Sequence, residues 1–146
     1  MNKQLTLGSL FDGSGGFPLA GMMCGIEPIW VSEIEPFPIR VTTKRIPQMK
    51  HYGDITKMHG GEIEPADIIT GGFPCQSVSV AGCRTGMKHT EHGDEQTTRS
   101  GLFFEATRII KEMREATNGK YPRYFIVENV PGLFSSNKGG DFRRLL

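Results

Sequence analysis

The sequence has little of several features that would point to a particular class of protein. It contains three cysteines, one tryptophan, a net charge of +1 and no apolar run long enough to cross a bilayer. So few cysteines exclude a disulfide scaffold, and we expect free thiols. The amino-terminal segment lacks the apolar core of a secretory signal, which predicts a cytoplasmic protein outside the membrane. Charge alone does not predict nucleic-acid binding, although basic residues cluster at 84–99 and 138–144.

Short apolar runs alternate with helical patterns along the chain. We expect strands at 5–11, 29–33, just before Asp54, 67–72 and 124–128, and helices at 17–25, 36–46 and 102–119. The polar stretch 76–100 is expected to be a long loop. This alternation predicts an α/β fold with a mostly parallel sheet and helices on both faces, whose ligands bind beyond the carboxyl ends of the strands.

A glycine turn follows the first expected strand. It reads Phe11-Asp12-Gly13-Ser14-Gly15-Gly16, and its glycines allow a ligand to approach the backbone at the start of a helix. Glu33 ends the second strand, where its carboxylate can accept hydrogen bonds from ribose hydroxyls. Turn and acid together indicate an adenosine-containing ligand. A tight connection with an exposed glutamate is the structural alternative.

Two further candidates follow later strands. Cys75 lies just past a strand end in Phe73-Pro74-Cys75-Gln76, and Glu128 ends the last strand before Asn129. Both therefore belong at the same edge of the sheet as the glycine turn. Taken singly, Cys75 could be a small buried hydrophobe and Glu128 a surface residue.

These residues together resemble the DNA cytosine-C5 methyltransferase family. The matching blocks occur in the family's order: Phe11 to Gly16, Glu33, Gly53-Asp54-Ile55, Pro74-Cys75-Gln76, Leu102-Phe103-Phe104 and Glu128-Asn129-Val130. The resemblance runs from about residue 5 to 133. It implies a Rossmann-like S-adenosylmethionine-dependent methyltransferase fold.

The resemblance also implies the cofactor and the residues that hold it. S-adenosylmethionine would lie on the glycine turn, with Glu33 at the ribose and Asp54 at the adenine amino group, while Ile34 and Leu102 sandwich the ring. The full set of expected cofactor-binding residues is Phe11, Gly13, Gly15, Gly16, Glu33, Ile34, Asp54, Ile55, Phe73, Pro74 and Leu102.

The chemistry implied by the resemblance is methyl transfer to C5 of cytosine in DNA. Cys75 would attack C6 of a flipped-out cytosine, Glu128 would assist at N3, and Ser79 matches a serine of the family's catalytic loop. Val78 stands where an aromatic residue is common in that loop. The base that removes the C5 proton stays unassigned, and no metal is expected.

The family's later blocks, which include the target-recognition region, do not follow Glu128. We therefore expect residues 1–146 to form a partial catalytic and cofactor-binding domain, incomplete at its carboxyl end. An uncovered strand edge near Phe125 predicts that a second polypeptide pairs there and supplies the missing half.

Several other interpretations stay open on the sequence alone. One is an inactive fragment, or half of a split enzyme, that only binds the cofactor. Another is an NAD-dependent dehydrogenase, for which the glycine turn and Glu33 would also serve. RNA could replace DNA as the substrate, and Cys83, His89 and His92 could form a zinc module.

Overall fold

The computed structural model describes residues 4–72, 101–129 and 143. Its strands and helices follow one another along the chain as β1 (Thr6–Leu10), α1 (Gly16–Met23), β2 (Glu27–Ser32), α2 (Pro36–Arg45), β3 (Lys50–His51), the 3-10 helix η1 (Ile55–Lys57), β4 (Ile68–Gly71), α3 (Gly101–Ala116) and β5 (Tyr124–Val127). The expected elements are present within a few residues of their predicted bounds. The expected loop at 76–100 lies outside the described residues.

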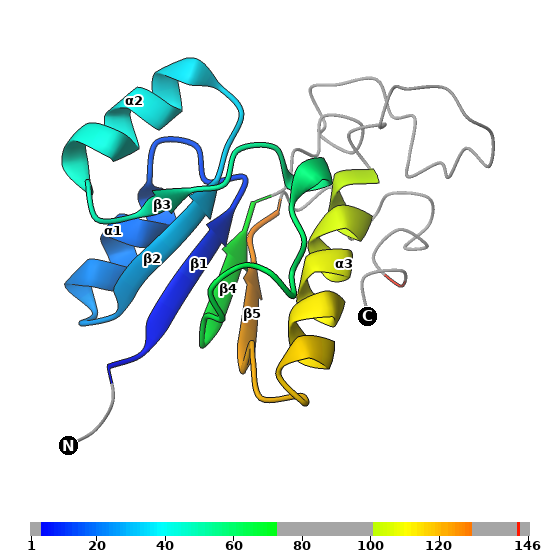
Figure 1. Cartoon of the computed structure of the whole chain (residues 1–146). Coiled ribbons are helices and arrows are strands. Elements are labelled where there is room, and N and C mark those ends of the chain that lie inside the picture. Colours follow the sequence, from blue (N-terminus) through cyan, green and yellow to red (C-terminus); the bar gives the residue numbers. More distant parts are fainter. Residues whose placement is uncertain (1–3, 73–100, 130–142, 144–146) are drawn as a thin grey trace.

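The five described strands form one sheet in the order β3-β2-β1-β4-β5, and every pair is parallel. Because parallel strands need crossovers, each connection passes over a face of the sheet. In Figure 1, α3 lies in front of the sheet and α1 behind it. The prediction of a parallel α/β sheet with helices on both faces is confirmed.

The two faces of the sheet carry different parts of the core. Alternation along β1 directs Leu7 toward α1, where Gly21 lies close to the Leu7 side chain, and directs Leu10 into the cluster on the α3 face. That larger cluster contains Leu10, Trp30, Ile55, Met58, Ile63, Ala66, Ile69, Ala106, Ile109 and Met113. The amphipathic pattern of α3 therefore seals one face of the sheet.

Trp30 is the largest fully buried side chain of this core. Its indole N–H donates to the carbonyl of Glu64 at 2.8 Å, and its ring meets Tyr52 edge-on. A side chain at Gly8 would overlap the Trp30 ring, so the neighbouring strand needs a glycine there. Burial of the ring and its N–H bond together fix the segment before β4 against the sheet.

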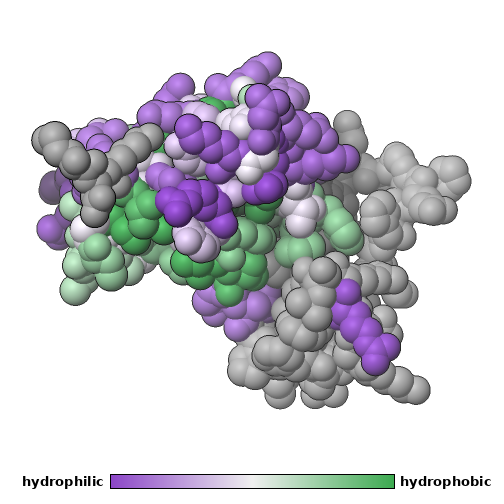
Figure 2. All heavy atoms as spheres, turned by 90° about the horizontal axis from the view of Figure 1, so that it is seen from below, coloured by the Kyte–Doolittle hydropathy of each residue, from purple (hydrophilic) through white to green (hydrophobic). Residues whose placement is uncertain are grey.

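The strands begin at the bottom of the view in Figure 1, so Figure 2, which is seen from below, looks onto their amino ends. Apolar and polar surfaces adjoin on this side of the molecule. Leu5, Asp67 and Arg123 each precede a strand there and line a pocket of about 420 Å³ with Lys120 and Tyr121. This pocket lies at the opposite edge from the predicted site.

β5 is the outermost of the described strands on its side of the sheet, as expected for the segment around Phe125. Phe125 packs against the main core, whereas Tyr124 and Ile126 are about half exposed. Association of this edge with a second polypeptide stays a prediction. Among the described helices, none is long and apolar enough to cross a membrane.

Candidate cofactor and catalytic site

The glycine turn after β1 has the positive φ angles that its glycines predict, 57° at Gly13 and 90° at Gly15. Phe11, which precedes these glycines, also has a positive φ angle, of 53°, which the sequence did not predict. At Gly15 a side chain would also come within 2.9 Å of the Thr42 methyl group on α2. At Gly13 and Gly16, by contrast, an added Cβ would meet no atom within 4 Å. The turn is therefore packed against α2 at Gly15 and open at Gly13 and Gly16, as a site where a ligand contacts the backbone requires.

Glu33 joins the turn to the end of β2. Its Oε2 accepts the Gly13 N–H at 2.7 Å, while Oε1 accepts the N–H groups of Ile34 and Glu35 at 2.7 and 2.9 Å. A carboxylate has about four acceptor sites, so these bonds leave one, on Oε2. The fold thus brings the turn and the acid together and leaves room for one further donor.

Asp12 is a feature of the turn that sequence reasoning missed. It is 7% exposed; its Oδ1 accepts the Ser9 hydroxyl at 2.7 Å, and its buried Oδ2 has no hydrogen-bond partner within the described part of the chain. Burial raises the pKa of Asp12 from 3.8 to about 6; the Ser9 bond opposes this rise and the charge of Glu33 adds to it. No sequence pattern distinguishes such an aspartate from an exposed turn residue.

Asp54 stands at the start of η1, beside the end of β2. The Ser32 hydroxyl donates to the Gly53 carbonyl at 2.7 Å, which ties this segment to the strand. Asp54 Oδ1 accepts both the N–H and the hydroxyl of Thr56, at 3.0 and 2.8 Å. The backbone bond, then the hydroxyl bond, lower the pKa of Asp54, so its carboxylate is ionised at neutral pH and acts only as an acceptor.

The apolar residues expected around the cofactor differ in exposure. Ile34 is 64% exposed directly after Glu33, which leaves its side chain free for a ligand. Leu102 is partly buried at the start of α3, against the main core. Ile55 is 3% exposed and belongs to that core, so its side chain supports the site from below and only its backbone could meet a ligand.

Glu128 follows β5 at the same edge of the sheet. Its N–H donates to the Gly71 carbonyl at 3.0 Å, and its Oε2 lies 3.2 Å from where a Cβ on Gly72 would be. The Phe17 ring of α1 approaches the same point at 4.0 Å. The structure therefore brings Glu128 to the end of β4, which leads into Phe73-Pro74-Cys75.

Some of the expected residues lie outside the described part of the chain. They are Phe73, Pro74, Cys75 and Ser79, with Cys83, His89 and His92 of the zinc alternative. Their roles remain predictions.

The fold and the site together define a class of protein. A parallel sheet with a glycine turn after its first strand, and carboxylates after the second and near the third, is the arrangement typical of nucleotide-binding α/β proteins. Comparison with known proteins identifies the family within this class.

The family model for C-5 cytosine-specific DNA methylase matches residues 5–146. The chain belongs to this family, as the sequence motifs predicted. It is 38% identical over 138 residues to the type II methyltransferase M1.ScrFI of Lactococcus lactis subsp. cremoris, covering 94% of this chain and 31% of that protein.

Two other similarities concern a phage protein and a solved structure. The chain is 36% identical over 138 residues to a DNA N-6-adenine-methyltransferase of Escherichia phage P1, covering 92% of this chain and 18% of that protein. A crystal structure of a prophage-encoded DNA modification methyltransferase from E. coli has a TM-score of 0.69 at 24% identity, covering 97% of this chain and 36% of that one. It confirms the fold. The chain spans less than a third of the two curated relatives.

Proposed function

We propose that this chain carries the cofactor-binding and nucleophile-bearing part of an enzyme that methylates C5 of cytosine in DNA, with S-adenosylmethionine as the methyl donor. The observation that carries the proposal is the bond from Gly13 N–H to Glu33, which joins the glycine turn to an acid at the carboxyl edge of the sheet. Family membership supports cytosine as the target base and duplex DNA as the partner. DNA as the partner also predicts a cytoplasmic location.

The residues present fit an adenosine-containing cofactor. The open space above Gly13 and Gly16 would accept the ligand against the backbone, and the remaining acceptor site on Glu33 would take a ribose hydroxyl. Asp54 would accept the adenine amino group, and exposed Ile34 would cover the ring. When bound, S-adenosylmethionine supplies an electrophilic methyl group on sulfur.

The residues near the end of β4 would act on the cytosine. The Cys75 thiolate would form a bond to C6, which loads electron density onto C5 so that C5 can take the methyl group, while the electron pair of the broken S–CH₃ bond stays on the sulfur as a neutral thioether. Glu128, directly after the adjacent strand β5, would form a hydrogen bond to N3 of the cytosine. Loss of the C5 proton would then return the electron pair and release the thiolate.

A transfer assay on the chain tests this function. The protein is incubated with methyl-labelled S-adenosylmethionine and mixed-sequence duplex DNA, and the DNA is digested to nucleosides. We expect label in 5-methylcytosine, its loss in Cys75→Ser, and its retention in Cys24→Ser, because Cys24 is an exposed thiol at the end of α1.

Three results of this assay would contradict the proposal. Label in N6-methyladenine would show that the chain methylates adenine, the activity that the name of the phage P1 relative states. Label in 5-methylcytosine that persists in Cys75→Ser would remove the nucleophile assignment. Absence of label from every reaction would refute transfer by this chain.

The same assay with RNA in place of DNA decides the substrate polymer. We expect transfer to duplex DNA and none to RNA, since the family model is that of a DNA methylase. The opposite result would overturn DNA as the partner.

A further inference from the structure

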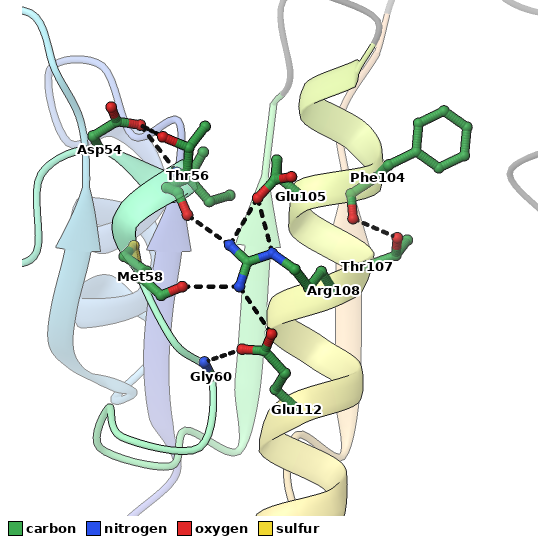
Figure 3. A network of polar contacts seen from close by, with 10 residues as sticks. Asp54, Thr56, Met58, Gly60, Phe104, Glu105, Thr107, Arg108 and Glu112 are labelled. Atoms are coloured by element: carbon green, nitrogen blue, oxygen red, sulfur yellow. Dashed lines mark hydrogen bonds and ion pairs between the residues drawn. The ribbon is translucent and has the colours of Figure 1, made fainter. Parts of the chain in front are cut away.

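Arg108 on α3 uses its whole guanidinium group to hold the segment that follows Asp54. Its Nη2 donates to the Ile55 carbonyl at 2.9 Å and its Nη1 to the Met58 carbonyl at 2.8 Å. The other N–H groups meet Glu105 and Glu112, one turn to either side on the same helix, at 2.7 to 2.9 Å. Figure 3 shows the guanidinium between the helix and the backbone of η1.

Glu112 extends this contact to the next part of the segment. Its Oε2 accepts the Gly60 N–H at 2.6 Å, while its Oε1 accepts Arg108. A side chain at Gly60 would overlap the Ile109 carbonyl, so the backbone lies directly against α3 there. The segment from Ile55 to Gly60 is therefore fixed to the helix at three backbone groups.

The charges in this network favour its formation. Burial alone would raise the pKa of Glu112, but the Gly60 N–H bond and the Arg108 guanidinium lower it overall, so the carboxylate stays ionised. Arg108, Glu105 and Glu112 side chains are each about 30% exposed, so water screens them only in part. A planar guanidinium suits this fork of carbonyls and carboxylates, and a lysine ammonium does not reproduce it.

Asp54 is the residue that this anchored segment presents. It directly precedes Ile55, and both bonds from Thr56 fall on its Oδ1. In Figure 3 its second oxygen points away from Thr56. The position of that second oxygen therefore depends on the position of η1, which Arg108 holds on the other side.

We propose that Arg108 is a positioning residue for recognition of the cofactor's purine, because it sets the Asp54 carboxylate where it meets a 6-amino group. The inference rests on the proposed cofactor site. Its chemical consequence is specificity: an ionised carboxylate accepts a hydrogen bond from the amino group of adenine and repels the 6-oxo group of hypoxanthine.

The experiment compares S-adenosylhomocysteine with S-inosylhomocysteine by titration calorimetry on the full chain. We expect the wild type to favour the adenosine compound by about 10-fold to 100-fold, the range for a hydrogen bond to a charged group. In Arg108→Met this ratio falls below about threefold, because a displaced acceptor keeps little of its directional bond. Arg108→Lys gives a similarly low ratio.

Arg114→Met is the matched control. Arg114 lies on the same helix and its Nη1 donates to the Pro122 carbonyl at 2.9 Å, away from η1. We expect its ratio to stay at the wild-type value.

The double variant Asp54→Ala/Arg108→Met is a second control. Its ratio should equal that of Asp54→Ala alone, since the two substitutions remove the same interaction with the 6-amino group.

A merely structural Arg108 would weaken both ligands equally and leave their ratio unchanged, and that result overturns the inference. A lowered ratio in Arg114→Met would overturn it as well. If Arg108→Met loses its folded near-ultraviolet spectrum, Arg108→Lys decides by the same ratio. A wild type that binds neither compound would instead refute the proposed cofactor site, and the inference with it.

Discussion

Replacing Asp12 with asparagine should make the variant progressively more stable, relative to the wild type, as the pH rises from acid to neutral. The aspartate is buried in the glycine turn, with Oδ1 on the Ser9 hydroxyl and Oδ2 without a partner among the described residues. Ionisation therefore places a charge where only one oxygen is hydrogen-bonded. Asparagine keeps the size of the side chain and an oxygen for Ser9, and it never ionises.

The magnitude follows from the pKa of Asp12. Burial raises it from 3.8 to about 6, and a raised carboxyl pKa favours folding only while the group is protonated. The contribution is fully present below pH 3.8 and is lost as the pH rises through about 6. A tenfold change in proton affinity corresponds to about 1.4 kcal/mol, so the whole loss is about 3 kcal/mol.

The assay is urea unfolding at several pH values between 4 and 8, on the wild type and Asp12→Asn. We expect the variant to gain on the wild type by up to about 3 kcal/mol as the pH rises, with most of the gain complete near pH 7. Ser9→Ala should move the transition to higher pH, because the Ser9 bond lowers the pKa of Asp12. A constant difference between wild type and Asp12→Asn at every pH would refute this reasoning.

Two glycines give further predictions that separate folding from ligand binding. Gly16→Ala should leave stability unchanged or raise it by up to about 1 kcal/mol in urea unfolding, since a Cβ there meets no atom within 4 Å, yet should weaken S-adenosylmethionine in calorimetry. Unchanged affinity would show that the ligand does not approach Gly16. Gly60→Ala should lose about 1 to 3 kcal/mol of stability through overlap with the Ile109 carbonyl, and a neutral result would contradict the close approach to α3.

Much of the fold could be predicted because its signals are local. The apolar run before Phe11 and the β-branched run at Ile68 and Ile69 end in glycines, and α3 shows an apolar residue every three or four positions. The sheet order could not be predicted, because it depends on pairings between distant segments. β1, for example, lies between β2 and β4, which are separated by more than thirty residues of sequence.

The candidate site divides in the same way. Glu33 could be placed beside the glycine turn because both follow neighbouring parallel strands. The ion pairs of Arg108 with Glu105 and Glu112 have helical spacing that a sequence can show. The hydrogen bond from Arg108 to the Met58 carbonyl joins residues 50 positions apart, and no pattern in the sequence indicates it. The buried position of Ile55 was also not readable, because the short turn of η1 directs it inward.

The most direct test of the cofactor site is calorimetric titration of S-adenosylmethionine into the wild type, Glu33→Gln and Glu27→Gln. Glu27 is an exposed glutamate at the amino end of the same strand, so it controls for charge. We predict binding by the wild type and Glu27→Gln, and at least about tenfold weaker binding by Glu33→Gln, which loses a charged acceptor. Equal affinity of Glu33→Gln and wild type, or no binding by the wild type, would contradict a cofactor site on the glycine turn.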